Sequence, residues 1–358
     1  MSGLAPYGTE SFYGARNDLR LNLSGGGFRA AAFHLGVVRW LFDSGALPFV
    51  NEIWSVSGGS LVSAWMWKNR DWLFDSGRPT AKDFDQAFCE PLRGLLVRDV
   101  RTVPILCSIG INMFWKGLRI RLLEREFRRL FDLREAVSRG ECGPRFGLVA
   151  FSVQKRRSVV LDPDDQRLSR QVAASAAFPP FFGPVALDGD AFLDGGLGTN
   201  LGIEPAHLHE WRCLLVSDAS RGAPDWLSSR FSPVWLKALA LIKSGSDRVA
   251  RQFLVSSDSD SVIVSIAPLP IADWFNDLPS QFDRRGLRVL ARLRTDLAGF
   301  DSSSVRQLEA AGYELARECF GEQLRGWALR LEGEEPGWLP DQVGLAEWLH
   351  DWLDNDGY

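Results

Sequence analysis

Hydrophobic and polar positions follow a strand–turn–helix rhythm along the chain. Residues 19–23 alternate apolar and polar side chains, and residues 50–56 are apolar and β-prone; small residues and then good helix formers follow each run. Strands are predicted near residues 19–23, 50–56, 146–152, 157–161, 191–193, 212–217 and 262–266. Helices are predicted near residues 28–44, 60–69, 119–138, 168–176, 232–254, 283–298 and 303–320. Alternation of this kind predicts an α/β fold with a mostly parallel sheet between helical layers.

The turn after residues 50–56 carries the most informative residue, Ser57. It stands in the run Ser55-Val56-Ser57-Gly58-Gly59, and a helix-like run begins at Ser60. A serine between small residues at a sharp strand-to-helix turn is typical of a nucleophile elbow, which holds the hydroxyl at the tip of the turn. The alternative is a plain loop, because Ser-Gly-Gly-Ser occurs in many loops.

A second turn, Ser24-Gly25-Gly26-Gly27-Phe28-Arg29, joins the first predicted strand to the first predicted helix. Bare backbone N–H groups at such a turn bind either a phosphate or the oxyanion of acyl transfer. Gly25-x-Gly27-x-x-Ala30 formally fits the dinucleotide fingerprint, which also needs an acidic residue at the end of the second strand. Glu52 opens that strand instead, so the pattern favours the oxyanion interpretation. A tight turn remains the structural alternative, although it explains one or two glycines better than three.

A third turn places Asp194 directly after the apolar run at residues 191–193 and before Gly195-Gly196. A serine nucleophile needs a base, and no histidine follows a predicted strand; the four are His34, His207, His209 and His350. His34 lies in an apolar helical stretch and is predicted to be a packing residue. Asp188 and Asp190 have the pattern of hairpin-turn residues, so Asp194 is the best-placed base. An Asp that merely forms a turn before Gly is the structural alternative.

In order and spacing, these three motifs resemble those of the patatin-like phospholipase family, in its bacterial type. The run at residues 173–182 also resembles the family's segment between nucleophile and aspartate, and the similarity covers roughly residues 19–220. Two positions depart from the family pattern. Ser55 stands where the family usually has glycine before the nucleophile, and Ala30 stands where glycine often follows the arginine.

The resemblance implies a three-layer α/β/α patatin-like fold with a mostly parallel central sheet and a helical insertion. It also implies a Ser–Asp dyad that works without histidine, metal or cofactor, with Ser57 as nucleophile and Asp194 as base. The implied oxyanion hole consists of the backbone N–H groups of Gly25, Gly26 and Gly27, and the implied supporting residues are Arg29, Gly58 and Gly59. Arg29 would steady the loop or lie near an anionic substrate head, and a surface ion pair is the alternative.

The activity implied is that of a carboxylic ester hydrolase, a phospholipase A-like enzyme that cleaves acyl esters of membrane glycerolipids. Its substrate would be a phospholipid or a membrane surface. Some bacterial proteins of the family act as antiviral effectors switched on by cyclic nucleotides, so a lipase gated by a small-molecule activator is the main alternative. A dinucleotide-binding protein is the less favoured one.

Composition narrows the class of protein. The 358 residues are 46% hydrophobic and 24% charged, with a formal net charge of −4, which argues against a nucleic-acid polymer as partner. The five cysteines show no metal spacing and no paired pattern, which favours a reducing compartment. Residues 1–18 lack the apolar core of a signal peptide, and no charge-free apolar run reaches 18 residues. We therefore expect a cytoplasmic protein, peripheral at most at the inner membrane surface.

We expect a single domain over residues 1–358, with a helical insertion at residues 75–140. Residues 103–118 are apolar but too short to span a bilayer. Only three acidic residues lie in this region, against nine basic ones. The basic residues are Arg93, Arg98, Arg101, Lys116, Arg119, Arg121, Arg125, Arg128 and Arg129. The insertion is interpreted either as a lid or anionic-lipid contact, or as a buried subdomain with a solvated basic face. The acidic, Trp-rich segment 321–358 is expected to dock on the main domain.

Overall fold

The structure is a computed structural model of the whole chain. It describes residues 19–74, 79–99, 117–134, 143–179, 181–203, 213–220, 260–265, 293, 297 and 299–332. For residues 260–265 and 322–332 it describes the backbone alone.

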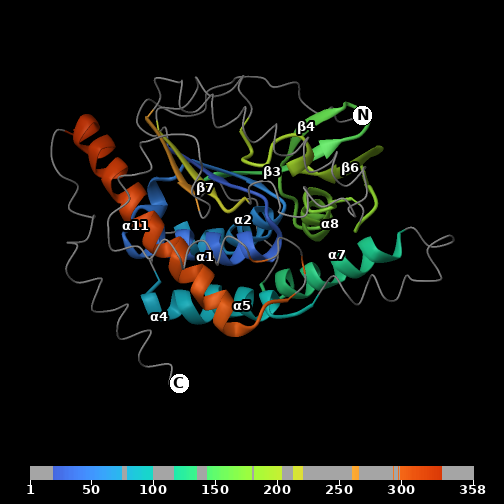
Figure 1. The fold of residues 1–358 in the computed structure, drawn as a ribbon, viewed down its shortest axis with the longest axis horizontal. Helices are drawn as coiled ribbons and strands as arrows, with labels where there is room; N and C mark the ends of the chain where they lie inside the picture. The colour runs from blue at the N-terminus through green and yellow to red at the C-terminus, as the bar shows by residue number, and fades with distance from the viewer. Residues whose placement is uncertain are drawn as a thin grey trace, which may run out of the picture.

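The described elements follow the predicted alternation of strands and helices (Figure 1). The strands are β1 (Leu19–Leu23), β2 (Glu52–Val56), β3 (Arg145–Ser152), β4 (Arg157–Leu161), β5 (Val185–Leu187), β6 (Asp190–Asp194), β7 (Cys213–Asp218) and β8 (Asp260–Ser265). The longer helices are α1 (Gly27–Asp43), α2 (Gly58–Lys68), α7 (Leu118–Phe131), α8 (Leu168–Ser175) and α11 (Ser302–Glu332). Shorter helices are α3 (Arg70–Phe74), α4 (Ala81–Phe84) and α5 (Glu90–Leu96), with a π-helical turn at Asp85–Cys89 and 3-10 turns at Leu47–Phe49 and Gly195–Leu197.

One mixed sheet forms the centre of the fold. Its strands lie in the order β5-β6-β3-β2-β1-β7-β8, with β4 paired to β3 off this path. The pairs β3–β2, β2–β1, β1–β7 and β7–β8 are parallel, whereas the β3–β4, β3–β6 and β5–β6 pairs are antiparallel. The predicted α/β class with a mostly parallel sheet is therefore confirmed.

Strand β3 aligns β2 and β6 end to end. Its residues 148 and 149 pair with both β2 and β4, so those two strands lie on opposite edges of β3. Residues 150–152 pair with both β4 and β6, which again lie on opposite edges. Strands β2 and β6 thus share one edge of β3. Val56 is paired with Val149 and Asp194 with Ala150, so the ends of the two strands meet.

Helices α1, α2 and α8 lie along one side of this sheet (Figure 1). Helix α1 is apolar almost all round and is buried over nearly its whole length, as expected for a helix enclosed by other elements. Helix α11 crosses it in close contact. A methyl group on Gly36 would overlap the carbonyl oxygen of Glu309, and one on Gly312 would overlap that of Phe33. These two glycines allow the helices to touch backbone to backbone.

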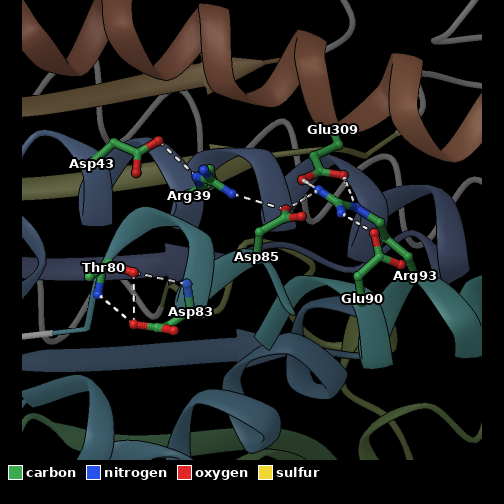
Figure 2. Close-up of polar contacts among 8 residues, drawn as sticks. All are labelled: Arg39, Asp43, Thr80, Asp83, Asp85, Glu90, Arg93 and Glu309. Atoms are coloured by element: carbon green, nitrogen blue, oxygen red, sulfur yellow. Dashed lines mark hydrogen bonds and ion pairs between the residues drawn. The ribbon is translucent and has the colours of Figure 1, made fainter. Parts of the chain in front are cut away.

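A buried charge network ties α11 to α1 and to the π-helical turn (Figure 2). Arg93 on α5 forms a bidentate pair with Glu309 on α11, at 2.6 and 2.7 Å, and lies 3.0 Å from Asp85. Asp85 also accepts a hydrogen bond from Arg39 on α1, whose Nε contacts Asp43. Arg93 is thus a buried residue that pairs with carboxylates on α11 and in the π-helical turn.

The structure departs from the predicted elements in several places. Residues 70–74 and 81–96 form the short helices α3, α4 and α5 and the π-helical turn. Their separate bounds were not predicted, although residues 75–140 were expected to be a helical insertion, and β5 was missed. Helix α11 runs to Glu332, beyond the predicted end at residue 320. Several predicted segments lie outside the described residues. They are the expected helix at 232–254, nearly all of the expected helix at 283–298, the apolar run at 103–116 and the Trp-rich tail after residue 332. Within the described helices, none has the length and hydrophobicity required to cross a bilayer.

Candidate active site

Two strand–turn–helix units lie side by side at the centre of the sheet. Strands β1 and β2 are parallel neighbours, with Leu23 opposite Ser55, so the glycine loop after β1 adjoins the turn after β2. The contact is so close that a methyl group on Gly58 would overlap the Gly27 backbone. The side chain of Ser55, in the position where glycine was expected, is accommodated because its hydroxyl donates to the Gly147 carbonyl at 3.3 Å.

The Ser57 turn has the strained backbone of a nucleophile elbow. Ser57 has φ of 52° and ψ of −115°, a conformation that non-glycine residues rarely adopt and that must be held by its surroundings. Its N–H donates to the Ser175 hydroxyl at 2.9 Å, and Ser175 in turn donates to the Val149 carbonyl at 2.6 Å. Ser60, one turn further along α2, pairs with the same hydroxyl at 2.8 Å. Ser175, at the end of α8, therefore braces the turn.

The Ser57 hydroxyl meets the Asp194 carboxylate. Ser57 Oγ donates to Asp194 Oδ2 at 2.7 Å, and the two residues are 7% and 4% exposed. The other carboxylate oxygen, Oδ1, accepts the Gly196 N–H at 2.7 Å, which fixes the plane of the group. A carboxylate held this way, with one oxygen on a serine hydroxyl, can accept the proton of that hydroxyl.

The glycine loop differs from the expectation at one residue. The Gly25 N–H donates to the Asn200 carbonyl at 3.0 Å, so this amide is already engaged. Within the described part of the chain, the amides of Gly26 and Gly27 have no hydrogen-bond partner. Gly27 N lies near the residue that follows Ser57, because a methyl group on Gly58 would come within 3.1 Å of it. Two of the three expected amides are therefore available.

This geometry coincides with a sequence match to a known family. Residues 21–207 match the family model described as patatin-like phospholipase, just over half of the chain. The chain belongs to the patatin-like phospholipase family. Strands β1 to β6 and the turns that carry Ser57 and Asp194 all lie within or at the edge of the matched region. No curated protein sequence matches this patatin-like chain.

Three solved structures with similarity to this patatin-like chain are distant from it in sequence. VipD from Legionella pneumophila is 12% identical, with a TM-score of 0.35, over 85% of this chain and 66% of that one. Human GIVD cytosolic phospholipase A2 is 12% identical, with a TM-score of 0.44, over 89% and 60%. The type III effector protein ExoU is 14% identical, with a TM-score of 0.34, over 96% and 60%. The patatin-like chain thus spans at most about two thirds of the length of each.

Arg29 lies in the protein interior, away from the surface. It is fully buried, and its guanidinium donates to the carbonyls of Ala219 and Leu293. Ala219 adjoins the glycine loop, since a methyl group on Gly26 would come within 3.0 Å of its oxygen. Arg29 therefore supports the surroundings of the loop from inside. The surface ion pair is therefore wrong, because the Arg29 side chain is fully buried.

His34 is the packing residue that the sequence predicts. Its ring is buried, with Nε2 donating to the Ser24 carbonyl at 2.8 Å and Nδ1 accepting from the Ser217 hydroxyl at 2.7 Å. Burial lowers the pKa of His34 to about 4, against the raising effects of the Ser24 carbonyl and Asp218. The ring is therefore neutral at pH 7. It supports the patatin-like loop from behind and has no contact with Ser57 within the described chain.

The rival acidic residues lie away from the serine. Asp188 is in the β5–β6 hairpin turn and pairs with Arg167 at 2.6 Å. Asp190 opens β6 and accepts the Ser152 hydroxyl. Glu52 lies at the opposite end of β2 from Ser57, near Arg20 and Arg145, so it cannot take the ribose-binding place that the dinucleotide interpretation requires. His207, His209 and His350 lie outside the described residues.

Two residues of the site were missed by sequence reasoning. Ser175 lies in a run of alanines and Asn200 ends a turn sequence, and neither position carries a local signal of its contacts. Both act on residues more than 100 positions away in the chain: Ser175 on Ser57, and Asn200 on Gly25. Their proximity to the two motifs could have been inferred only once the order of the strands was known. Among the residues described, no group of His, Cys, Asp or Glu has the arrangement of a metal site.

Proposed function

We propose that this protein is a serine lipid acyl hydrolase, phospholipase A-like in its chemistry, that cleaves acyl esters of membrane glycerolipids. The observation that carries the proposal is the 2.7 Å hydrogen bond from Ser57 Oγ to Asp194 Oδ2 in a member of the patatin-like phospholipase family. Serine is a weak nucleophile at its ordinary pKa, and a carboxylate at this distance can accept its proton as the oxygen attacks.

The proposed reaction has two halves. Ser57 Oγ attacks the ester carbonyl carbon while Asp194 Oδ2 takes the hydroxyl proton, which gives a tetrahedral oxyanion. The C–O bond to the glycerol oxygen then breaks, and the leaving alkoxide takes the proton from Asp194. In the second half Asp194 accepts a proton from water, whose oxygen attacks the acyl-enzyme. The fatty acid leaves and the proton returns to Ser57.

Gly26 and Gly27 are the proposed oxyanion donors. Their amides are available, while that of Gly25 is engaged by Asn200. Gly27 adjoins the elbow directly, and it is the first residue of α1, whose N-terminal N–H groups favour negative charge. Removal of one such donor typically costs about 3 kcal/mol of transition-state stabilisation.

The protein is proposed to bind its lipid substrate at a membrane surface. Helix α7 presents an arginine face formed by Arg121, Arg125, Arg128 and Arg129, all exposed. Glu126 lies 2.6 Å from Arg129 and 3.6 Å from Arg125, whereas Arg121 and Arg128 form no ion pair within the described residues. Arginines that project from one helix face attract the anionic headgroups of a bilayer, although the net charge of the whole chain is −4.

Single substitutions at the two central residues test the proposal. Ser57→Ala and Asp194→Asn are each expected to lower fatty-acid release from a mixed lipid extract by about a thousandfold or more, with products identified by mass spectrometry. The matched controls are Ser63→Ala, a buried serine on α2 whose hydroxyl has no partner among the described residues, and Asp190→Asn on the same strand as Asp194. Both controls are expected to retain activity.

The same assay separates this proposal from its alternative. Release that appears only when a cyclic nucleotide is added would identify a gated lipase with the same chemistry. Full activity in folded Ser57→Ala would overturn the hydrolase assignment altogether.

A further inference from the structure

Asn200 holds Gly25 on both sides. Its main-chain carbonyl accepts the Gly25 N–H at 3.0 Å, and its side-chain Nδ2 donates to the Gly25 carbonyl at 3.4 Å. Asn200 is 1% exposed, six residues beyond Asp194, so it links the Asp-Gly-Gly turn to the glycine loop.

The side-chain contact fixes the direction of the next amide. In a trans peptide the C=O and the following N–H point in opposite directions. The Gly25 carbonyl is directed at Asn200 Nδ2, so the Gly26 N–H of the same peptide is directed away from Asn200. Gly25 itself adjoins the elbow, because a methyl group on it would come within 3.2 Å of Ser57 Cβ. The orientation of this one peptide therefore sets where the Gly26 donor lies relative to Ser57.

The packing around the amide leaves it little freedom. A methyl group on Gly25 would come within 2.5 Å of Asn200 Oδ1, and one on Gly196 within 2.8 Å. The amide is thus enclosed between the glycine loop and the turn that orients Asp194. Its Oδ1 is buried and has no hydrogen-bond partner among the described residues, an arrangement that costs free energy.

The neighbouring peptide does not depend on this side chain. The Ser24 carbonyl accepts a hydrogen bond from His34 Nε2, and the Gly25 N–H is held by the Asn200 main chain. The Gly25 carbonyl also accepts from the Ser24 hydroxyl at 3.4 Å, but that contact comes from the adjacent residue of the same loop. Truncation of the Asn200 side chain therefore removes the one contact that ties the Gly25–Gly26 peptide to the Asp194 turn.

We propose that Asn200 is a positioning residue that aligns the Gly26 amide with the oxyanion formed at Ser57. The inference rests on the proposed hydrolase function, whose transition state it concerns. It predicts that Asn200 stabilises the tetrahedral state and contributes little to the binding of intact substrate, because its contacts are to the donor loop.

The test compares Asn200→Ala with the wild-type protein on a soluble p-nitrophenyl ester. The kcat is expected to fall about 100-fold, the effect of a misplaced catalytic group, while KM stays within about twofold, since ground-state contacts are unchanged. The inhibition constant of a trifluoromethyl ketone lipid analogue, whose adduct carries an oxyanion, should rise in proportion to the loss of kcat/KM. The affinity of a non-hydrolysable ether lipid should stay the same.

Asn22→Ala is the matched control. Asn22 is also a buried asparagine, and its Nδ2 donates to the carbonyls of Leu201 and Gly202 in the same segment, but it contacts neither Gly25 nor Ser57. It is expected to lower stability without a selective loss of ketone affinity. Asn200→Asp, which replaces the donating amide by an oxygen of the same size, gives the same comparison if Asn200→Ala does not fold.

Three outcomes of these measurements test the proposed role of Asn200. A selective loss of kcat and ketone affinity in the Asn200 variants supports the inference. Unchanged kcat in Asn200→Ala, or an equal loss in Asn22→Ala, overturns it while the hydrolase function stands. A wild-type protein whose ester hydrolysis does not depend on Ser57 overturns both.

Discussion

Ser57 Oγ lies 2.7 Å from Asp194 Oδ2, although 137 positions separate the two residues in the chain. The contact arises because β2 and β6 lie end to end along the same edge of β3, with Val56 and Asp194 paired to the consecutive residues Val149 and Ala150. Ser57 follows Val56 directly and so comes to face the aspartate. The position of the Asp194 carboxylate relative to the Ser57 hydroxyl is thus set by strand register, which a rigid sheet holds more closely than a loop would.

Ser175→Ala is expected to impair the elbow without touching either reacting group. The substitution leaves the Ser57 N–H buried without its acceptor and removes the contact to Ser60. A buried donor left unsatisfied costs about 1–3 kcal/mol, so the free energy of unfolding should fall by that amount. The kcat should fall as well, because the strained Ser57 backbone loses its brace. Ser63→Ala serves as control, and a Ser175→Ala protein with unchanged kcat would show that the brace is dispensable.

His34 is expected to make the protein less stable in mild acid. Its pKa is lowered to about 4 in the fold, chiefly by burial, from an unfolded value of 6.5. The unfolded chain therefore binds more protons between these two pH values. Stability from this group is fully present above pH 6.5 and is lost as the pH falls toward 4, by about 3 kcal/mol in total.

Urea unfolding at pH 7 and pH 4.5 measures this effect. The carboxylates also titrate in this range, so the wild-type protein is compared with His34→Gln, which lacks the titrating group. The wild type should lose more stability than the variant over the interval. Equal losses in the two proteins would contradict a buried neutral histidine.

Gly36→Ala and Gly94→Ala are expected to act in opposite directions. A methyl group on Gly36 would overlap the Glu309 carbonyl of α11, and the two helices must separate, at a cost of about 3 kcal/mol. Gly94, on α5, has open space around its Cα, so alanine should raise stability by about 0.5–1 kcal/mol through its better helix propensity. Thermal unfolding of both variants checks the sign of each change. Stabilisation by Gly36→Ala would rule out the close crossing of α1 and α11.

Arg93→Met should be far more costly than Arg129→Met, although both arginines have a carboxylate at 2.6 Å. The Arg93–Glu309 side chains are 7% and 4% exposed, whereas those of Arg129 and Glu126 are 54% and 14% exposed. Loss of one partner strands a buried charge and costs about 3–5 kcal/mol, while an exposed pair contributes about 1 kcal/mol or less. Chemical denaturation gives both values. Similar losses in the two variants would contradict the burial of the Arg93–Glu309 pair.

The arginine face of α7 is expected to bind anionic vesicles. Glutamine at Arg121, Arg125 and Arg128 removes three positive charges, each contributing about 1 kcal/mol near an anionic surface, so partitioning onto phosphatidylglycerol vesicles should fall about 100-fold. Sedimentation with these vesicles, against neutral phosphatidylcholine vesicles, measures the change. The control variant carries glutamine at Lys155, Arg156 and Arg157, three exposed basic residues at the β3–β4 hairpin. An equal fall in the control would indicate a general charge effect, with no special role for α7.

The local features of this protein follow from short stretches of its sequence. Small residues after an apolar run define a sharp turn, so the glycine loop, the Ser57 elbow and the Asp194 turn were all recognisable. Most predicted strands and helices that fall on described residues lie within a few residues of their observed bounds. His34 was correctly predicted as a packing residue from the apolar stretch around it. Such features depend on backbone sterics and side-chain periodicity, which act over a few neighbouring residues.

Which of these local features come into contact depends on the three-dimensional fold. The end-to-end placement of β2 and β6, the hydrogen bond that occupies the Gly25 amide, and the roles of Ser175, Asn200 and Arg93 all depend on contacts between residues distant in the chain. A sequence pattern says which face of an element is apolar, but not which partner covers it or which distant carbonyl a donor will reach. Those choices follow from strand order and packing, where many weak contacts act together.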